Sequence, residues 1–173
     1  LSKIEAGGGE LHPELLDVHG LCAAAIELVR VQAEQKGIAT TTAVEPTVTT
    51  IVADPLRLKQ ILVNLLSNAV AYSPAGTRVA VAGRTKAGVV EIDVTDQGIG
   101  IPDSEQSRIF ERFYRVDPAR SRQTGGTGLG LAIVKHVCVN HGGECTLWSV
   151  EGEGSTFTLR LPVAAAAGSS FGV

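Results

Sequence analysis

The hydrophobic and polar positions of this chain follow two periods, one typical of helices and one typical of strands. A helix is predicted from Val18 to Lys36, because apolar residues recur there at helical intervals and Gly37 follows. A stronger helical stripe starts at Pro55, which follows the helix-starting residue Asp54, and runs to the Ser-Pro pair at 73–74. A third, apolar helix is predicted in "LGLAIVKHVCVNHGG", ending at Gly142.

Alternation of period two predicts the strands. "IATTTAVE" and "TTIVADP" are two short strands, residues 77–96 form a hairpin around "TKAG", and "ECTLWSV" and "GSTFTLRLP" form a second hairpin around "EGEG". Residues 103–117 are expected to be helical in part. This order of elements predicts an α+β fold, a two-layer α/β sandwich with a mixed, largely antiparallel sheet against three main helices.

Composition narrows the function classes. A chain of 173 residues with 44% hydrophobic residues suits one globular domain. Its net charge of -3 gives no positive electrostatic potential to attract a phosphate backbone, so nucleic acid is not an expected partner. No long apolar run or signal-peptide pattern is present, so we expect no membrane contact by this chain. Three cysteines without metal-ligand spacing are interpreted as packing residues. The start at Leu1 and the lack of methionine indicate a fragment of a longer protein.

One carboxylate stands at an unusual position. Asp96, in "DQGIGIP", shares the period-two phase of Val90, Ile92 and Val94, so its side chain is expected to point inward with them. A buried carboxylate needs hydrogen bonds or a compensating charge. Either an Asp-x-Gly turn forms, with Gly98 at positive φ, or the carboxylate meets a ligand; this stretch alone does not decide.

Two further patterns carry candidate chemistry. Asn64 and Asn68 lie four residues apart on one face of the strong helix, and amide oxygens suit Mg²⁺; the alternative is an Asn pair bonded within the protein. In "GGTGLGL" four glycines open a helix after a basic loop, where free N–H groups favour phosphate; the alternative is a hinge. No Walker A lysine follows them.

These signals have a specific order: QxxxNLLSNAxxYS, DQGIGIP, FERFYRVD, GGTGLGLAIVKH and GEGSTFTLRLP. Over residues 17–162 the chain closely resembles the catalytic, ATP-binding domain of bacterial two-component sensor histidine kinases, in the gyrase, Hsp90 and MutL (GHKL, Bergerat-fold) superfamily. The resemblance implies an ATP-binding catalytic domain at 17–163, preceded at 1–16 by the end of a dimerisation helix and a linker. Residues 164–173 are expected to form a flexible tail.

The resemblance also implies roles for single residues. Asp96 would accept a hydrogen bond from the adenine amino group and reject guanine, and Tyr72 would lie along the nucleotide. Asn68, with Asn64, would hold Mg²⁺ against the triphosphate. Gly98 and Gly100 would let the main chain approach the base, and Thr156 would support the same edge of the base. Ile101 is also expected to belong to the nucleotide site.

A lid over ATP is implied at residues 116–127. The residues expected on its phosphate side are Gly126, Thr127, Gly128, Leu129 and Gly130. Arg115 and Asn64 are the candidate catalytic residues, although an exposed arginine is more often only solvated. Ala71 stands where the family usually has lysine, so either arginines replace that phosphate contact or ATP binds more weakly. Phe110 and Phe113 are interpreted as core residues; the alternative that the resemblance implies is that one of them helps to position the lid and to dock the helical domain.

The resemblance further implies a phosphoryl transfer whose acceptor is not part of this chain. The acceptor histidine would lie on an upstream helical domain, and His12 lacks the context for that role. The chain is expected to bind ATP and Mg²⁺ without phosphorylating itself. Its parent protein is expected to be a homodimer in the bacterial cell membrane. This domain would lie on the cytoplasmic side, and the parent would pass phosphate to a response regulator. The alternatives are a degenerate nucleotide-sensing or docking module and a serine kinase of the anti-sigma type.

Overall fold

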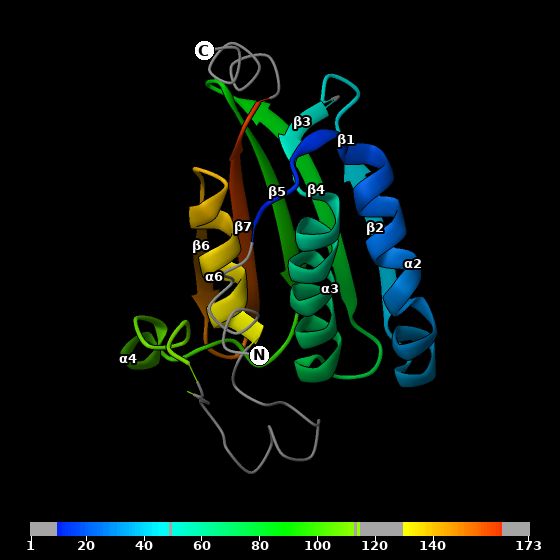
Figure 1. The fold of residues 1–173 in the computed structure, drawn as a ribbon. Helices are drawn as coiled ribbons and strands as arrows, with labels where there is room; N and C mark the ends of the chain where they lie inside the picture. The colour runs from blue at the N-terminus through cyan, green and yellow to red at the C-terminus, as the bar shows by residue number, and fades with distance from the viewer. Residues whose placement is uncertain (1–9, 49, 113, 115–129, 164–173) are drawn as a thin grey trace.

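The computed structural model describes residues 10–48, 50–112, 114 and 130–163. A layer of helices covers one face of a sheet (Figure 1). The helices are α2 (Val18–Lys36), α3 (Pro55–Tyr72), α4 (Asp103–Gln106) and α6 (Gly130–Asn140). The strands are β1 (Glu14–Asp17), β2 (Ala39–Val44), β3 (Thr50–Ala53), β4 (Arg78–Lys86), β5 (Val89–Asp96), β6 (Glu144–Val150) and β7 (Gly154–Pro162).

The main sheet has five strands in the order β2-β4-β5-β7-β6. Only the β2–β4 pairing is parallel, and the three other pairings of this sheet are antiparallel. The two predicted hairpins are β4–β5 and β6–β7. The two-layer α+β fold with a mixed, largely antiparallel sheet is therefore confirmed.

The two long helices begin and end at the predicted signals. Oδ1 of Asp54 accepts the main-chain N–H groups of Leu56 (3.1 Å) and Arg57 (3.3 Å), and so caps α3. Gly37 ends α2 in the left-handed conformation, with a φ of 75°. Both ends are thus set by residues whose local chemistry is readable in the sequence.

The core lies between the helices and the sheet. The largest buried side chains of α3 are Leu58, Ile61, Leu62, Leu65 and Leu66. They pack with the inward residues of β5 and β7, among them Ile92 and Leu159. Full burial of one such side chain stabilises a fold by about 1.5–3 kcal/mol, so this stripe holds the two layers together.

Phe110 packs against this core, as predicted. Its ring meets that of Phe157 edge to face, with centroids 6.1 Å apart. Phe113 lies outside the described residues. Among the described residues before Phe110, α4 forms a single helical turn, in agreement with the expectation that residues 103–117 are helical in part.

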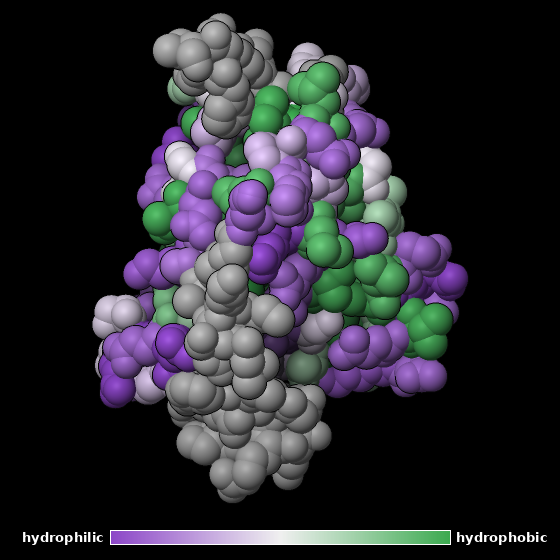
Figure 2. Space-filling view, viewed as in Figure 1, coloured by the Kyte–Doolittle hydropathy of each residue, from purple (hydrophilic) through white to green (hydrophobic). Residues whose placement is uncertain are grey.

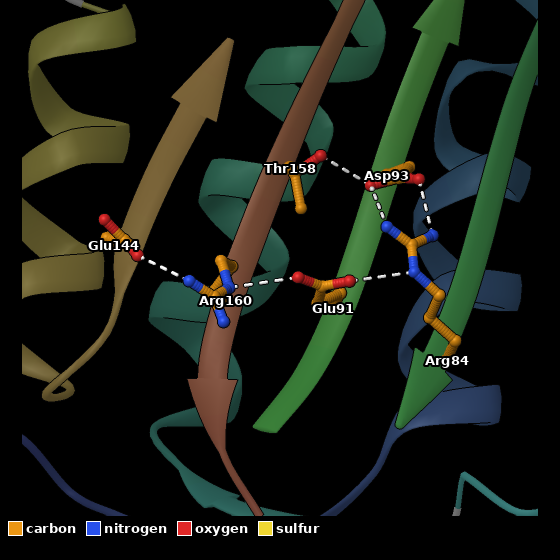
Figure 3. Close-up of polar contacts among 6 residues, drawn as sticks. All are labelled: Arg84, Glu91, Asp93, Glu144, Thr158 and Arg160. Atoms are coloured by element: carbon orange, nitrogen blue, oxygen red, sulfur yellow. Dashed lines mark hydrogen bonds and ion pairs between the residues drawn. The ribbon is translucent and has the colours of Figure 1, made fainter. Parts of the chain in front are cut away.

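The outer face of the sheet is polar (Figure 3). The Glu91 carboxylate lies between Nε of Arg84, at 2.8 Å, and Nε of Arg160, at 3.0 Å. Asp93 accepts from Nη1 of Arg84 (2.7 Å) and from the Thr158 hydroxyl (2.6 Å). These charges compensate one another, so this face is stable without a second helical layer.

One strand was not predicted. Residues 14–16 were expected to belong to a linker, but together with Asp17 they form β1, which pairs antiparallel with β3 from Glu14↔Ala53 to Asp17↔Thr50. Leu15 is 71% exposed while Leu16 packs on the core. A four-residue strand has too little alternation to be recognised in the sequence. Its partner also lies more than thirty residues further along the chain, so no local pattern indicates the pairing.

The helical side of the molecule carries a mixed surface (Figure 2). Large apolar side chains that are exposed on the long helices include Leu28 and Val31 on α2 and Leu56 at the start of α3. Within the described ranges, no helix is both long and apolar enough to cross a membrane.

Candidate functional site

Four segments that are distant in sequence meet at one end of the sheet. They are the end of β5, the last turns of α3, the β6–β7 turn and the start of α6. The main-chain N–H of Ser155 donates to Asp96 (3.2 Å), and a Cβ added to Gly98 would lie 2.6 Å from the carbonyl oxygen of Tyr72. These contacts bring the predicted Asp and Tyr together.

Asp96 forms the Asp-x-Gly turn that its sequence allowed, and its contact with a ligand stays a prediction. Its Oδ1 accepts the N–H of Gly98 at 2.9 Å, which closes the Asp-x-Gly turn, and also the N–H of Ser155. Its Oδ2 has no hydrogen bond to any described residue. Burial raises the pKa of Asp96 more than these two bonds lower it. One oxygen of this half-buried carboxylate is therefore open to a further hydrogen-bond donor.

The glycines after Asp96 are required by close approach within the protein. Gly98 is not at positive φ, so that part of the turn prediction was wrong; its hydrogen atom instead faces the Tyr72 carbonyl. Gly100 has a φ of 71°, and a Cβ there would lie 2.2 Å from the carbonyl oxygen of Val150. Their approach to a bound base stays a prediction.

Thr156 does not lie beside Asp96. Its hydroxyl is 3.0 Å from that of Thr95, and both belong to the polar outer face of the sheet. Ser155 pairs directly with Asp96 and is only 5% exposed, on the inward face. The expectation for Thr156 is corrected, since side chains alternate along a strand and counting back from buried Phe157 places Ser155 inward.

Ser149 is a site residue that the sequence did not indicate. It is 8% exposed, and its hydroxyl lies 2.8 Å from Ser155 Oγ and 3.0 Å from the carbonyl oxygen of Gly154. It also accepts the N–H of Ile101 at 2.8 Å. Nε2 of Gln106 donates to the Ile101 carbonyl at 2.8 Å, so the predicted residue Ile101 is held on both sides.

The predicted asparagines lie half-buried on α3, beside the buried leucine stripe. A Cβ added to Gly130 would lie 3.9 Å from Nδ2 of Asn64, so the start of α6 directly faces this side chain. Asn68 and half-buried Tyr72 continue the stripe by one turn each, towards Gly98. The helix therefore connects the glycine-rich segment with the Asp96 end.

The Asn64 and Asn68 side chains suit a magnesium ion that is bound partly by the protein and partly by phosphate oxygens. The described residues contain no group of three His, Cys, Asp or Glu side chains that could hold a metal alone. Two amide oxygens leave most of an octahedral shell to other oxygens, as Mg²⁺ commonly has when it is bound with nucleotide phosphates.

Several predicted residues lie outside the described part of the chain. They are Arg115, Gly126, Thr127, Gly128, Leu129 and the rest of the expected lid at 116–127. The choice between a phosphate cradle and a hinge in "GGTGLGL" therefore stays open, apart from the position of Gly130.

Comparison with known proteins decides the family. The family described as histidine kinase-, DNA gyrase B-, and HSP90-like ATPase matches residues 53–165, which include α3, Asp96 and the β6–β7 hairpin. The chain belongs to this family.

Among relatives of this ATPase-family chain, the sensor-like histidine kinase SenX3 of Mycolicibacterium smegmatis is 50% identical over 164 residues. That match covers 94% of the chain and 42% of SenX3, so the chain spans less than half of this relative. The sensor histidine kinase WalK of Bacillus subtilis is 46% identical over 111 residues, 63% of this chain and 18% of WalK.

Solved structures agree with this placement. The mycobacterial sensor histidine kinase MprB superimposes with a TM-score of 0.76 at 32% identity, covering 88% of this chain and 99% of that one. Full-length ShkA in complex with AMPPNP gives a TM-score of 0.80 at 35% identity, covering 92% of this chain and 33% of that one. The chain is thus the ATP-binding catalytic domain found in sensor histidine kinases.

Proposed function

We propose that this domain binds Mg²⁺·ATP and donates the γ-phosphate to a histidine of an upstream helical domain, for relay to a response-regulator aspartate. The observation that carries the proposal is Asp96, a half-buried carboxylate with one oxygen bonded and one left for a ligand. Such an acceptor fits the adenine amino group. It would meet the carbonyl oxygen of guanine with like partial charge.

The triphosphate would extend from this end along α3. Tyr72 would lie beside the nucleotide, and Asn64 and Asn68 would hold Mg²⁺ opposite the start of α6. The ion would neutralise phosphate charge. We assign the phosphate contacts to the predicted segment after the lid, Gly126, Thr127, Gly128, Leu129 and Gly130.

The protein's part in the transfer is positioning and charge. The bond between the γ-phosphorus and the bridging oxygen breaks as a bond to the acceptor imidazole nitrogen forms; ADP leaves and the imidazole proton passes to solvent. Arg115 would place its guanidinium over the γ-phosphate oxygens. Its charge would replace that of the lysine that the family usually has at the position of Ala71.

The partners follow from this reaction. Residues 1–16 would join the domain to the upstream phosphoacceptor domain of a homodimeric parent. The main-chain N–H of His12 donates to Oδ2 of Asp54 at 3.0 Å, so the joining segment is bonded to the start of α3. We place the domain on the cytoplasmic side of a parent that is anchored in the bacterial membrane.

Calorimetry of ATP binding with and without Mg²⁺ tests the nucleotide site. We expect the wild type to bind ATP with Mg²⁺ at about -5 to -8 kcal/mol, the Asp96→Asn variant to bind it about tenfold to a hundredfold more weakly, and GTP to bind the wild type more weakly than ATP. Asp93→Asn is the matched control, because it changes the same side chain on the outer face of the same strand. Loss of binding in both variants would contradict the assignment of Asp96.

Kinase activity needs a separate assay. The helical domain of the parent, supplied in trans with [γ-³²P]ATP, should become labelled only when this domain is present. ATP binding without labelling would favour the degenerate nucleotide-sensing module instead.

A further inference from the structure

A buried pair of serine hydroxyls lies next to the Asp96 carboxylate. Ser149 and Ser155 are 8% and 5% exposed, and their Oγ atoms are 2.8 Å apart. The main chain of Ser155 is bonded to Asp96 through its N–H.

The hydrogens of this pair can be assigned from their partners. A hydroxyl has one hydrogen and two acceptor sites. The carbonyl of Gly154, 3.0 Å from Ser149 Oγ, can only accept; if Ser149 donated to Ser155 instead, these two oxygens would face each other with no hydrogen between them, so we assign the Ser149 hydrogen to Gly154. The N–H of Ile101 can only donate to Ser149, at 2.8 Å. With this assignment the remaining site of Ser149, 2.8 Å from Ser155 Oγ, accepts the hydrogen of Ser155.

This assignment gives the Ser155 hydroxyl a fixed direction. Its only hydrogen is committed to Ser149, so it can offer nothing but lone pairs to a ligand. Oδ2 of Asp96 likewise only accepts when it is ionised. The inward end of β5 and β7 thus combines two acceptors and no side-chain hydroxyl donor from this pair.

We propose that Ser149 is a specificity-determining residue, which excludes 6-oxopurine nucleotides by holding the Ser155 hydroxyl as an acceptor. The inference rests on the proposed ATP site. A 6-amino group donates to such acceptors, whereas a 6-carbonyl oxygen finds no donor there and leaves them unpaired. Ser149 acts through Ser155 and touches no nucleotide itself.

The test compares ATP with ITP, which carries a carbonyl oxygen at position 6 in place of the amino group. Dissociation constants of both are measured with Mg²⁺ for the wild type, Ser149→Ala, Ser155→Ala and the double variant. Thr146→Ala, exposed on the same strand as Ser149, is the control. Thermal melting verifies that each variant is folded.

In Ser149→Ala the hydrogen of Ser155 is released and can turn to the purine carbonyl. We expect the ATP-over-ITP preference to fall by about tenfold, the value of one hydrogen bond. The Ser149→Ala change should have no effect on this preference once Ser155 is alanine, because the hydroxyl that it frees is then absent. Thr146→Ala should keep the wild-type ratio.

Other results would overturn the inference. Equal weakening of ATP and ITP in Ser149→Ala, or the same fall in preference without the Ser155 hydroxyl, would make Ser149 a purely structural residue. If Ser149→Ala does not fold, Ser149→Cys keeps a γ atom at this position that accepts hydrogen bonds only weakly, and should lower the preference part of the way; an unchanged ratio contradicts the assignment. A wild type that binds neither nucleotide would refute the proposed function itself.

Discussion

The main-chain N–H of Asp54 donates to Nε2 of His141 across 3.0 Å, and this bond joins the start of α3 to the end of α6. Nδ1 of His141 lies 2.8 Å from the carbonyl oxygen of Val137, which can only accept. His141 is therefore the neutral tautomer with its hydrogen on Nδ1. The opposite end of α6 faces Asn64, so this bond fixes the helix that starts at the proposed phosphate site.

Removal of the imidazole should destabilise the domain. In His141→Ala the N–H of Asp54, a residue that is only 5% exposed, loses its acceptor. We expect the free energy of unfolding to fall by about 1–3 kcal/mol, measured by urea denaturation. His136→Ala on the exposed side of α6 is the matched control and should change little. Equal effects of the two variants would contradict a role for this bond.

The Asp54 carboxylate should make stability dependent on acid pH. Burial alone would raise the pKa of Asp54, but N–H donors from His12, Arg57 and Leu56, with the Arg57 charge, hold it below its ordinary value. Such a group stabilises the fold above its unfolded pKa of about 3.9, and this contribution is lost as pH falls through the folded pKa. Asp54→Asn should therefore be less stable than wild type at pH 7.

The difference between wild type and Asp54→Asn should shrink below about pH 4, where the wild-type carboxylate begins to take up its proton. Urea unfolding at a series of pH values measures it. A difference that is the same at pH 3 and pH 7 would show that the carboxylate charge contributes nothing.

Asp96 should behave in the opposite way. Burial raises its pKa more than the bonds from Gly98 and Ser155 lower it, so the ionised form is disfavoured in the fold. Stability is then lost as pH rises from the unfolded pKa through the folded one, and the penalty persists at neutral pH. Asp96→Asn keeps an oxygen for both N–H donors and removes this penalty.

We expect Asp96→Asn to melt at or above the wild-type temperature at pH 7, while its affinity for ATP falls by about tenfold to a hundredfold. Melting followed by circular dichroism and calorimetry on the same sample separates the two effects. A clear drop in melting temperature would mean that the carboxylate stabilises the fold rather than serving a ligand.

Local chemistry explains which parts of the fold could be predicted. The caps Asp54 and Gly37 mark the ends of α3 and α2 in the sequence. The phase that Asp96 shares with buried Val94 predicted its inward, half-buried carboxylate. β1 could not be found in this way, because its pairing with β3 is supplied by tertiary structure.

The site was predicted less completely than the fold. Resemblance pointed to Thr156, although the alternation of β7 assigns the inward position to Ser155. Ser149 has no motif, and only the pairing of β6 with β7 brings it to Ser155. A hydroxyl network between strands depends on register, which a single sequence does not specify.

The cysteines should be unreactive in the folded domain. Burial raises the pKa of Cys138 to about 12, and burial together with the Asp17 charge raises the pKa of Cys22 to about 12. Burial also raises the pKa of Cys145. Since the thiolate is the reactive form, we expect negligible alkylation by iodoacetamide at pH 7.5 until denaturant is added, checked by mass spectrometry. Rapid native labelling would contradict the packing interpretation.

Glu91 should stabilise the sheet without affecting the nucleotide. Its side chain is 10% exposed between Arg84 and Arg160, on the face opposite Asp96. Nε of Arg160 is 3.0 Å from the Glu91 carboxylate but is not aligned for a hydrogen bond. Arg84 is therefore the stronger partner of Glu91. In Glu91→Ala, Arg84 keeps Asp93, and Arg160 keeps its 2.8 Å contact with Glu144.

Because both arginines retain a carboxylate and are themselves more than one-third exposed, we expect Glu91→Ala to cost about 1–2 kcal/mol in urea unfolding rather than the larger cost of a fully buried pair. Glu111→Ala, which breaks an exposed pair with Arg108, should cost close to nothing. ATP affinity should match wild type in both variants. A selective loss of ATP binding in Glu91→Ala would mean that the outer face is coupled to the Asp96 end of β5, and the two faces would then have to be treated as one site.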